Sequence, residues 1–278
     1  MSSKAAKEQA RKDALVSQFR QVTGVSQSEA VRYLKKYNYR IDAALDGLFN
    51  DPSAAATLAA AREPSGAQAT KKLGELFDEY KDNGGETMTV DGTMAFCQDI
   101  NLDLDDVVLL ALSYELKSPQ MGEFSRTGWI EGWKALKCDS RDTMKAALPK
   151  LRSRLQNDRA FFRSIYMYAF DFARTAGQRS IPIDNAKAFW AMLLPAGFAG
   201  DALVYEGPGE GWKPEYNQLW FDFLDAKGGR GISRDTWAMF FEFILTIDSC
   251  FQNHDEGAAW PSLIDEFVEY SRERLRSA

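Results

Sequence analysis

The stretch ISRDTWAMFFEFILTIDSCFQNHDEGAAWPSLIDEFVEY, residues 232–270, contains the pattern on which most of the chain is built. A polar turn opens it, an apolar helix follows, and an acidic loop leads into a second helix. Two acids, Asp235 and Asp265, lie near the expected helix starts, and Ala259 lies between them. Carboxylates at helix starts are stabilised by the helix dipole, but two of them beside a small residue can equally bind a basic partner. We favour the second interpretation.

The opening turn of this stretch recurs at three earlier places, each time with a helix before it and a helix after it. Every copy is Gly-rich or polar and contains one apolar residue; these residues are Val90, Phe124, Ile181 and Ile232. In three copies a tryptophan follows near the start of the next helix: Trp129, Trp190 and Trp237. The pattern is that of EF-hand helix–loop–helix units. The sequence therefore predicts an all-α fold built from such units.

Calcium binding by these turns is not expected. An EF-hand loop needs oxygen ligands at positions 1, 3 and 5 and a glutamate at position 12. With Ile232 at position 8, those positions hold Asp225, Lys227, Gly229 and Thr236. The other three turns also lack a calcium-binding set of ligands, because basic, apolar or glycine residues occupy some of the ligand positions in each of them. We interpret the units as degenerate EF-hands that keep the packing and have no metal.

Composition excludes several classes of protein. The chain has 278 residues, 45% of them apolar and 13% aromatic, which favours a large aromatic core. A formal charge of −6 argues against nucleic-acid binding and against anionic membranes. No signal segment and no apolar run long enough to span a membrane is present, so no membrane association is expected.

No catalytic group, metal site or cofactor site can be assigned. The cysteines, Cys97, Cys138 and Cys250, are odd in number and far apart, which fits a reducing compartment and no disulfides. A single histidine, His254, cannot complete a structural zinc site with them. Cys250 precedes His254 by four residues, but the apolar helix around it predicts a buried, structural thiol. A binding or scaffolding protein without a cofactor is the default.

The first fifty residues predict a separate small domain of three helices, residues 8–50. In the first two helices, apolar residues at helical spacing mark one face: Leu15, Phe19 and Val22, then Ala30, Leu34 and Tyr37. The third helix is expected from about residue 41 to 49. Residues 51–70 are rich in Ala, Ser and Pro and predict a linker. A larger helical domain then covers residues 71–278.

The small domain resembles the ubiquitin-associated (UBA-like) family. The resemblance rests on FRQVTGVS, on the central AVRYLKKYNY helix and on the closing AALDGLF. It implies a shallow apolar patch that binds ubiquitin, and by position this patch would contain Thr23, Gly24, Val25 and Leu48. The alternative is that Val25 and Leu48 belong to the core.

The larger domain resembles the potentiating-neddylation (PONY) domain of defective-in-cullin-neddylation proteins over about 200 residues. The resemblance rests on KDNGGETMTVDGTMAFCQDINLD, GEFSRTGWIEGW, IYMYAFDFAR, GISRDTW and GAAWPSLIDEFVEY. A UBA-like domain in front is that family's domain order, and the chain looks like a fungal-type member. The resemblance implies a scaffold-type ligase with no catalytic residue of its own, present in cytoplasm and nucleus and assumed monomeric. The alternative function is a ubiquitin-binding adaptor.

The resemblance also implies two further partners and their sites. The C-terminal region of a cullin would bind an acidic patch made of Asp235, Ala259 and Asp265. The acetylated N-terminal tail of the Nedd/Rub-type conjugating enzyme would bind an apolar groove. The groove residues by position are Val90, Leu109, Leu112, Ser113, Phe124, Phe172 and Phe189. Acetylation removes a charge that would be costly to bury in such a groove.

Overall fold

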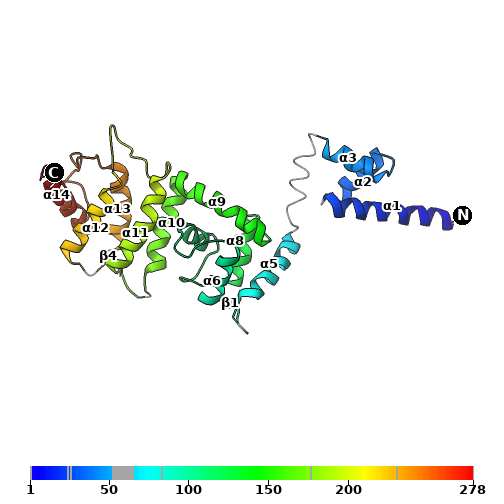
Figure 1. The fold of residues 1–278 in the computed structure, drawn as a ribbon, viewed down its shortest axis with the longest axis horizontal. Helices are drawn as coiled ribbons and strands as arrows, with labels where there is room; N and C mark the ends of the chain where they lie inside the picture. Colours follow the sequence, from blue (N-terminus) through cyan, green and yellow to red (C-terminus); the bar gives the residue numbers. More distant parts are fainter. Residues whose placement is uncertain are drawn as a thin grey trace. The chain divides into compact units, whose positions relative to one another are not determined.

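A computed structural model describes residues 2–23, 25, 27–51, 66–82, 84–175, 177–229 and 231–277. They form two compact units, residues 1–69 and 70–278, and each is described by itself. Both units are mainly helical, as the sequence predicts (Figure 1). Within the described ranges, no helix combines the length and the apolar character needed to cross a membrane.

The first unit is a bundle of three helices: α1 (Ser2–Thr23), α2 (Gln27–Lys36) and α3 (Ile41–Phe49). Its core contains Phe19, Ala30 and Leu34, as their helical spacing predicts. Val22 was expected on the same inner face, but 57% of it is exposed. The three-helix prediction is therefore confirmed, with a smaller apolar face on the first helix than expected.

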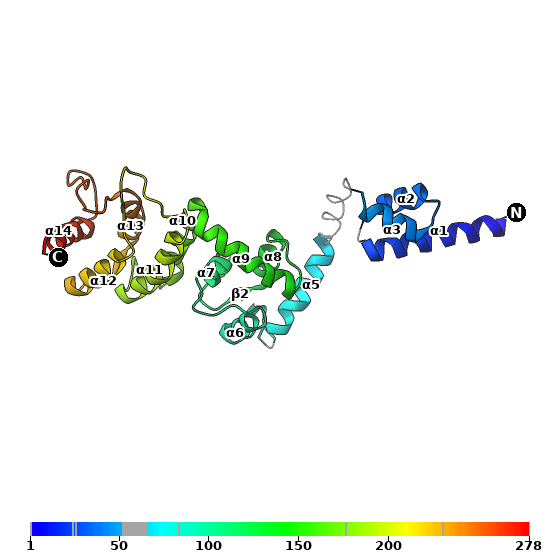
Figure 2. The same cartoon turned by 45° about the horizontal axis from the view of Figure 1, so that its top comes forward.

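The second unit begins within α5 (Gly66–Tyr80), a helix that starts in the stretch expected as linker. The first half continues through β1 (Thr87–Met88), α6 (Val90–Asp99), α7 (Val107–Glu115), β2 (Phe124–Ser125) and α8 (Arg126–Ala135). The helix α9 (Arg141–Asn157) follows. The second half contains α10 (Arg159–Ala173), β3 (Ser180–Ile181), α11 (Ile183–Phe198), α12 (Tyr216–Lys227), β4 (Ile232–Ser233), α13 (Arg234–Thr246) and α14 (Ser262–Ser277). We call α5–α8 the first lobe and α10–α13 the second lobe; α9 packs against α7 of the first and against α10 and α11 of the second (Figure 2).

The four turns pair in two short antiparallel ladders, one in each lobe. In the second lobe, Ile181 faces Ile232, and these are the apolar residues expected in the two turns. In the first lobe, Phe124 faces Met88 and not Val90. Met88 is fully buried, whereas Val90 starts α6 and is 52% exposed. The choice of Val90 as the apolar turn residue was therefore wrong by two positions.

The two lobes also share a motif and a buried hydrogen bond. In each lobe, the second strand ends at the serine of a Ser-Arg-x-x-Trp pattern. The pattern lies in FSRTGW in the first lobe and in ISRDTW in the second. The indole N–H of Trp129 donates to the carbonyl of Leu73 at 3.1 Å, and that of Trp237 donates to the carbonyl of Tyr166 at 2.9 Å. In both lobes the accepting residue precedes the buried apolar residue of the first strand by fifteen positions. Leu73 precedes Met88 in the first lobe, and Tyr166 precedes Ile181 in the second. The same bond therefore ties the last helix of each lobe to its first.

In the second lobe, Tyr166 is the centre of a buried polar network. Its hydroxyl donates to the carbonyl of Trp237 at 2.8 Å and accepts the indole N–H of Trp190 at 2.8 Å. The two indole rings stack with their centroids 4.8 Å apart. All three side chains are fully buried, and burial raises the pKa of the Tyr166 hydroxyl well above its usual value. Removing this hydroxyl would leave the buried indole N–H of Trp190 unpaired, while the carbonyl of Trp237 keeps its hydrogen bond within α13.

We predict that Tyr166→Phe lowers the free energy of unfolding by about 2–3 kcal/mol, because two buried hydrogen bonds are lost and the indole N–H of Trp190 is left without an acceptor. The matched control is Tyr168→Phe, whose half-buried hydroxyl makes one hydrogen bond to the carbonyl of Ser118 at 3.2 Å. We expect the control to lose only about 1 kcal/mol. Urea denaturation followed by tryptophan fluorescence measures both variants. Equal losses would contradict the central place of Tyr166.

Candidate functional site

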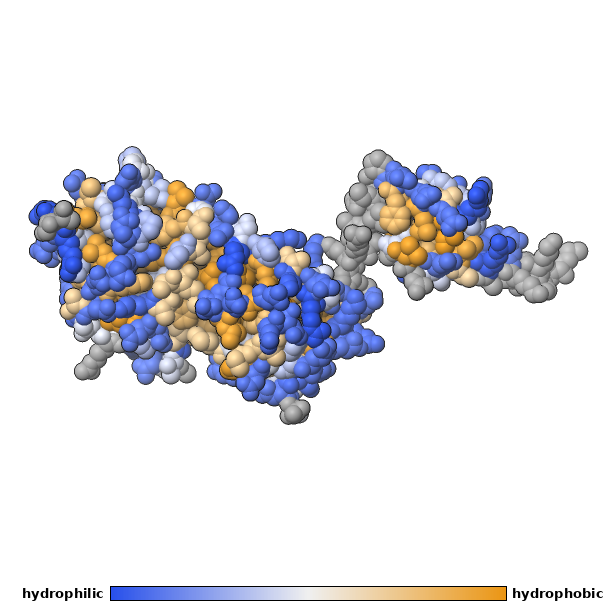
Figure 3. Space-filling view, in the orientation of Figure 1, coloured by the Kyte–Doolittle hydropathy of each residue, from blue (hydrophilic) through white to orange (hydrophobic). Residues whose placement is uncertain are grey.

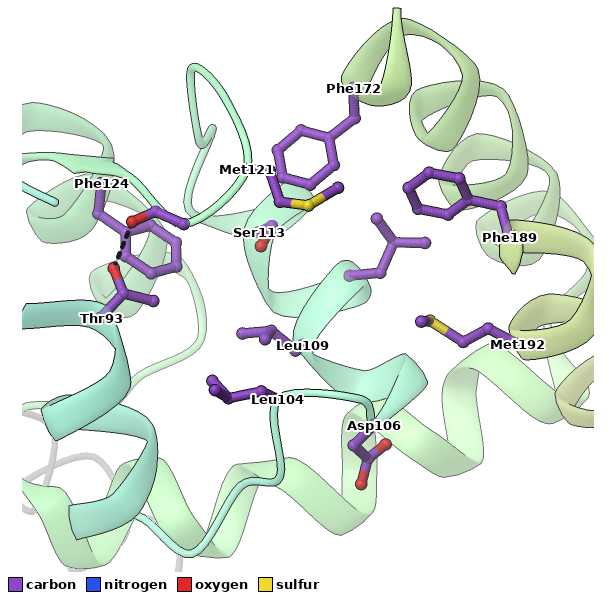
Figure 4. Close-up of a pocket in the computed structure, with 12 residues that line it drawn as sticks. Thr93, Leu104, Asp106, Leu109, Ser113, Met121, Phe124, Phe172, Phe189 and Met192 are labelled. Atoms are coloured by element: carbon purple, nitrogen blue, oxygen red, sulfur yellow. Dashed lines mark hydrogen bonds between the residues drawn. The ribbon is translucent and has the colours of Figure 1, made fainter. Parts of the chain in front are cut away.

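An apolar cavity of about 100 Å³ lies between the two lobes of the second unit. Five of the seven residues predicted for the tail groove line it. They are Leu109 and Ser113 from α7, Phe124 from β2, Phe172 from α10 and Phe189 from α11. Phe172 and Phe189 point into the space from one side, and Leu109 faces them from α7 (Figure 4). The structure therefore brings together residues that are up to eighty positions apart in the sequence.

The other two predicted groove residues do not line this cavity. Leu112 is fully buried and belongs to the core. It is adjacent to Ser113 in the same helix, so the two side chains point in different directions. Val90 lies at the rim, where its side chain borders Gly122, a glycine with a φ of 77°. A side chain at Gly122 would come within 2.9 Å of the Val90 Cγ2 atom, so only glycine fits there.

Several lining residues were missed by the sequence reasoning. Met192 lies three positions after Phe189 on α11, so helical spacing could have identified it. Leu104 and Met121 come from the loops on either side of α7, where no periodicity applies. The hydroxyl of Thr93 donates to the carbonyl of Gly122 at 2.9 Å and holds the loop of Met121 against α6 (Figure 4).

The one carboxylate at the cavity's edge is already engaged. Asp106 caps α7 by accepting the backbone N–H of Val108 at 2.9 Å, and it forms an ion pair with Arg152 of α9. Figure 4 shows its carboxylate pointing away from the two phenylalanines. Hydrophobic residues also gather over this part of the second unit's surface (Figure 3). The cavity therefore suits a small, uncharged, apolar group.

The first acid of the predicted acidic patch is free. Asp235 lies in the first turn of α13 and is exposed. The helix is capped by Ser233, whose hydroxyl accepts the backbone N–H of Thr236 at 3.0 Å. The carboxylate of Asp235 makes no hydrogen bond or ion pair with any residue that the structure describes. Capping is therefore not the role of Asp235.

The second acid has a partner that the sequence did not reveal. Asp265 lies in the first turn of α14, and its Oδ1 atom is 2.8 Å from Nε2 of His254. The His254 side chain is 1% exposed and packs against the rings of Phe243 and Trp260, with centroids 5.9 and 5.7 Å away. Asp265 itself remains 38% exposed. His254 thus holds one carboxylate oxygen and leaves the group accessible to a partner.

The two acids lie on different helices, Asp235 in the first turn of α13 and Asp265 in the first turn of α14. His254, the partner of Asp265, packs against Phe243, which belongs to the same helix as Asp235. Ala259 lies in the loop before α14 and is exposed. All three residues of the predicted patch are therefore accessible at the surface of the second unit.

Comparison with known proteins finds matches for both units of the chain. A family model described as "Cullin binding" matches residues 143–270, and a "UBA-like domain" model matches residues 13–55. "Defective in cullin neddylation protein 1" of Cryptococcus neoformans var. neoformans serotype D (strain B-3501A) is 36% identical over 94% of both chains. The chain belongs to the defective-in-cullin-neddylation family. The Mycosarcoma maydis protein of the same name is 33% identical over 96% of both chains, and human "DCN1-like protein 5" is 35% identical over 75% of this chain and 81% of its own.

In this family member, the residues predicted to bind ubiquitin are mostly in the core. Val25 and Leu48 are almost completely buried. Thr23 is 6% exposed, and its hydroxyl donates to the carbonyl of Phe19 at 2.7 Å. Gly24 lies outside the described residues. The prediction that Thr23, Val25 and Leu48 offer an apolar surface is wrong, because so small a unit uses nearly every apolar residue for its own core.

Apolar surface is present elsewhere on the first unit. Val22, near the end of α1, is 57% exposed, and Phe49, at the end of α3, is 56% exposed. Figure 3 shows apolar residues gathered on one face of this unit. Any ubiquitin contact would have to use exposed residues of this kind.

The cysteines differ from the sequence-based expectation at one position. Cys97 and Cys138 are buried, and burial raises the pKa of Cys97 to about 11 and also raises that of Cys138. Cys250 is exposed, so the prediction of a buried thiol there was wrong. The helix α13 ends at Thr246, and the carboxylate of Asp248 accepts the backbone N–H of Cys250 at 2.7 Å in the turn that follows. No group of three or more His, Cys, Asp or Glu in the described ranges could hold a metal ion.

We predict that one thiol of the folded protein reacts rapidly with a disulfide reagent at pH 8, and that Cys250→Ser removes this reaction. With a pKa of about 11, only about a thousandth of Cys97 is thiolate at that pH. Cys138 is protected by its burial and its raised pKa in the same way. All three thiols should react after denaturation. Rapid reaction of more than one thiol in the native protein would contradict this assignment.

Proposed function

We propose that the chain is a non-catalytic scaffold in cullin neddylation. In this proposal, the second unit binds the C-terminal region of a cullin through Asp235 and Asp265. The observation that carries the proposal is the exposed carboxylate of Asp235, which has no partner among the described residues and lies within the part of the chain matched by the cullin-binding family. A carboxylate in the first turn of a helix gains from the helix dipole without being used up by it, so it can also complement basic side chains of a partner.

The same unit would hold the conjugating enzyme of the modifier. The cavity between the lobes would receive the acetylated N-terminal residue of that enzyme's tail. Its volume of about 100 Å³ suits one small apolar group, and its only carboxylate is already paired. A free ammonium would lose its hydration in such a space without gaining a counter-ion. Acetylation removes that cost.

Simultaneous binding explains how a chain without a reactive group promotes transfer. Two partners on one scaffold meet at a high effective concentration. Orientation of the thioester toward the acceptor lysine lowers the entropic part of the barrier. Neither Cys97 nor Cys138 is suited to carry the modifier, because both are buried with raised pKa values. With three free thiols, this activity fits the cytoplasm and nucleus.

A ubiquitin-binding adaptor is the second candidate function. The UBA-like match and the exposed Val22 and Phe49 favour a ubiquitin contact on the first unit. The two functions are separable, because the second unit has its own core. Removing residues 1–60 would abolish an adaptor but leave transfer by the scaffold intact in vitro.

We predict that the full chain stimulates modifier transfer from a charged conjugating enzyme to a cullin C-terminal fragment. Asp235→Ala/Asp265→Ala should reduce the stimulation at least about tenfold, because partner charges lose their complement. The matched control, Asp42→Ala/Asp46→Ala, makes the same change in net charge on the exposed side of α3 and should act like wild type. Single-turnover transfer on gels measures all three.

Each outcome of this experiment has a separate meaning. Equal stimulation by wild type and by Asp235→Ala/Asp265→Ala would keep the scaffold function and reject the acidic patch. No stimulation by wild type would reject the scaffold and leave the adaptor. Loss of activity in a folded triple Cys→Ser variant would indicate a covalent intermediate instead.

We further predict that an acetylated tail peptide of the conjugating enzyme binds at least about a hundredfold more tightly than the same peptide with a free amine. Ser113→Leu should fill part of the cavity and weaken the acetylated peptide at least about tenfold. Ser153→Leu, on the exposed face of α9, is the matched control and should not change binding. Calorimetry measures the affinities, and thermal melting checks that both variants fold. Equal affinity for both peptides would reject the cavity as the tail site.

A further inference from the structure

The loops in front of the first strands share a glycine conformation and a backbone hydrogen bond in their described residues, which are 81–82 and 84–86 in the first lobe and 174–175 and 177–179 in the second. Gly84 and Gly177 occupy the same position and have φ values of 80° and 83°. The backbone N–H of Gly85 donates to the carbonyl of Asp82 at 3.0 Å, and that of Gln178 donates to the carbonyl of Thr175 at 3.1 Å. Equivalent side chains can therefore be compared between the lobes.

The residues that flank the two ladders face each other across the strands. In the first lobe, Glu86 lies opposite Arg126, and the backbone N–H of Arg126 approaches the carbonyl of Glu86 at 3.4 Å. In the second lobe, continuing the register of Ser180 with Ser233 places Arg179 opposite Arg234. An acid–base pair in one lobe thus corresponds to two cations in the other.

The first lobe balances its charges internally. Arg126 forms ion pairs with both Asp78 and Glu86. Asp78 also binds Lys81 at 3.2 Å. Two cations and two carboxylates therefore compensate each other in this cluster.

The second lobe lacks this balance. Asp171, the equivalent of Asp78, binds Arg234 at 3.2 Å and lies 3.8 Å from Arg174. Arg179 is exposed, and it makes no hydrogen bond or ion pair with any of the described residues. Two cations thus share one carboxylate, and Arg179, opposite one of them, has no counter-ion among the described residues, on a chain whose formal charge is −6. Like charges opposite each other on paired strands are destabilising, so this cluster gives the fold no advantage.

We propose that Arg179 and Arg234 together bind a carboxylate of the cullin partner. Guanidinium groups present paired N–H donors that match a carboxylate. Arg234 directly precedes Asp235, so the cationic pair is continuous with the acidic patch assigned above, and the inference rests on that proposed function. The partner surface should therefore carry an acidic side chain next to the basic one that contacts Asp235. Binding of that acid would relieve the repulsion between the two arginines.

Arg179→Glu tests this proposal, because it recreates the pairing of Glu86 with Arg126. We expect the melting temperature of the free protein to rise by roughly 1–3 °C, as an opposed ion pair replaces two cations. Affinity for the cullin C-terminal fragment should fall at least about tenfold, and the loss should be larger at low salt. Lys150→Glu makes the same charge change at an exposed position of α9 and should alter affinity less than about twofold.

Calorimetry and thermal melting of the full chain separate the outcomes. Unchanged affinity in Arg179→Glu, with loss in Asp235→Ala/Asp265→Ala, would overturn this inference and keep the proposed function. Equal losses in Arg179→Glu and Lys150→Glu would overturn it in favour of a general charge effect. A lower melting temperature in Arg179→Glu would contradict the assigned pairing. No binding by wild type would overturn the proposed function and this inference with it.

Discussion

A tryptophan indole that donates a hydrogen bond to a carbonyl of its lobe's first helix is the contact on which both lobes depend. Trp129 and Trp237 are completely buried, so neither their N–H groups nor the accepting carbonyls can turn to water instead. Each bond fixes the last helix of a lobe against the first, and the short ladder lies between them. The cavity forms where the two lobes meet. These hydrogen bonds fix the helices of each lobe and therefore also fix the positions of the residues that line the cavity.

Much of this arrangement could be predicted from the sequence, because turns and helix spacing are local. The helices and the apolar turn residues Ile181 and Ile232 follow from such local patterns, whereas the five cavity residues were expected only from the family resemblance. The choice between Met88 and Val90 could not be made by spacing, since alternate residues of a strand point to the same side. Only the start of α6 at Val90 decides it, because the chain leaves the strand there.

Features that depend on distant or competing contacts could not be predicted. The sequence around Cys250 suggested an apolar helix. The helix ends before this residue, because the carboxylate of Asp248 accepts backbone N–H groups of the turn that follows. The contact between His254 and Asp265 joins a loop to a helix beside a cluster of packed aromatic rings. Residue spacing in the sequence gives no signal for such a contact. Val25 and Leu48 looked suited to a surface patch, but the small unit needs both for its core.

The repeat also explains where the two lobes are free to differ. Burial constrains the apolar strand residue and the tryptophan, and helix capping constrains the serine of the Ser-Arg-x-x-Trp pattern. The position after the arginine is under neither constraint; it is Thr127 in one lobe and Asp235 in the other. The residue opposite the arginine is equally free, and it is Glu86 in one lobe and Arg179 in the other. The interior therefore preserves one architecture, while surface positions at matching places differ in charge between the lobes.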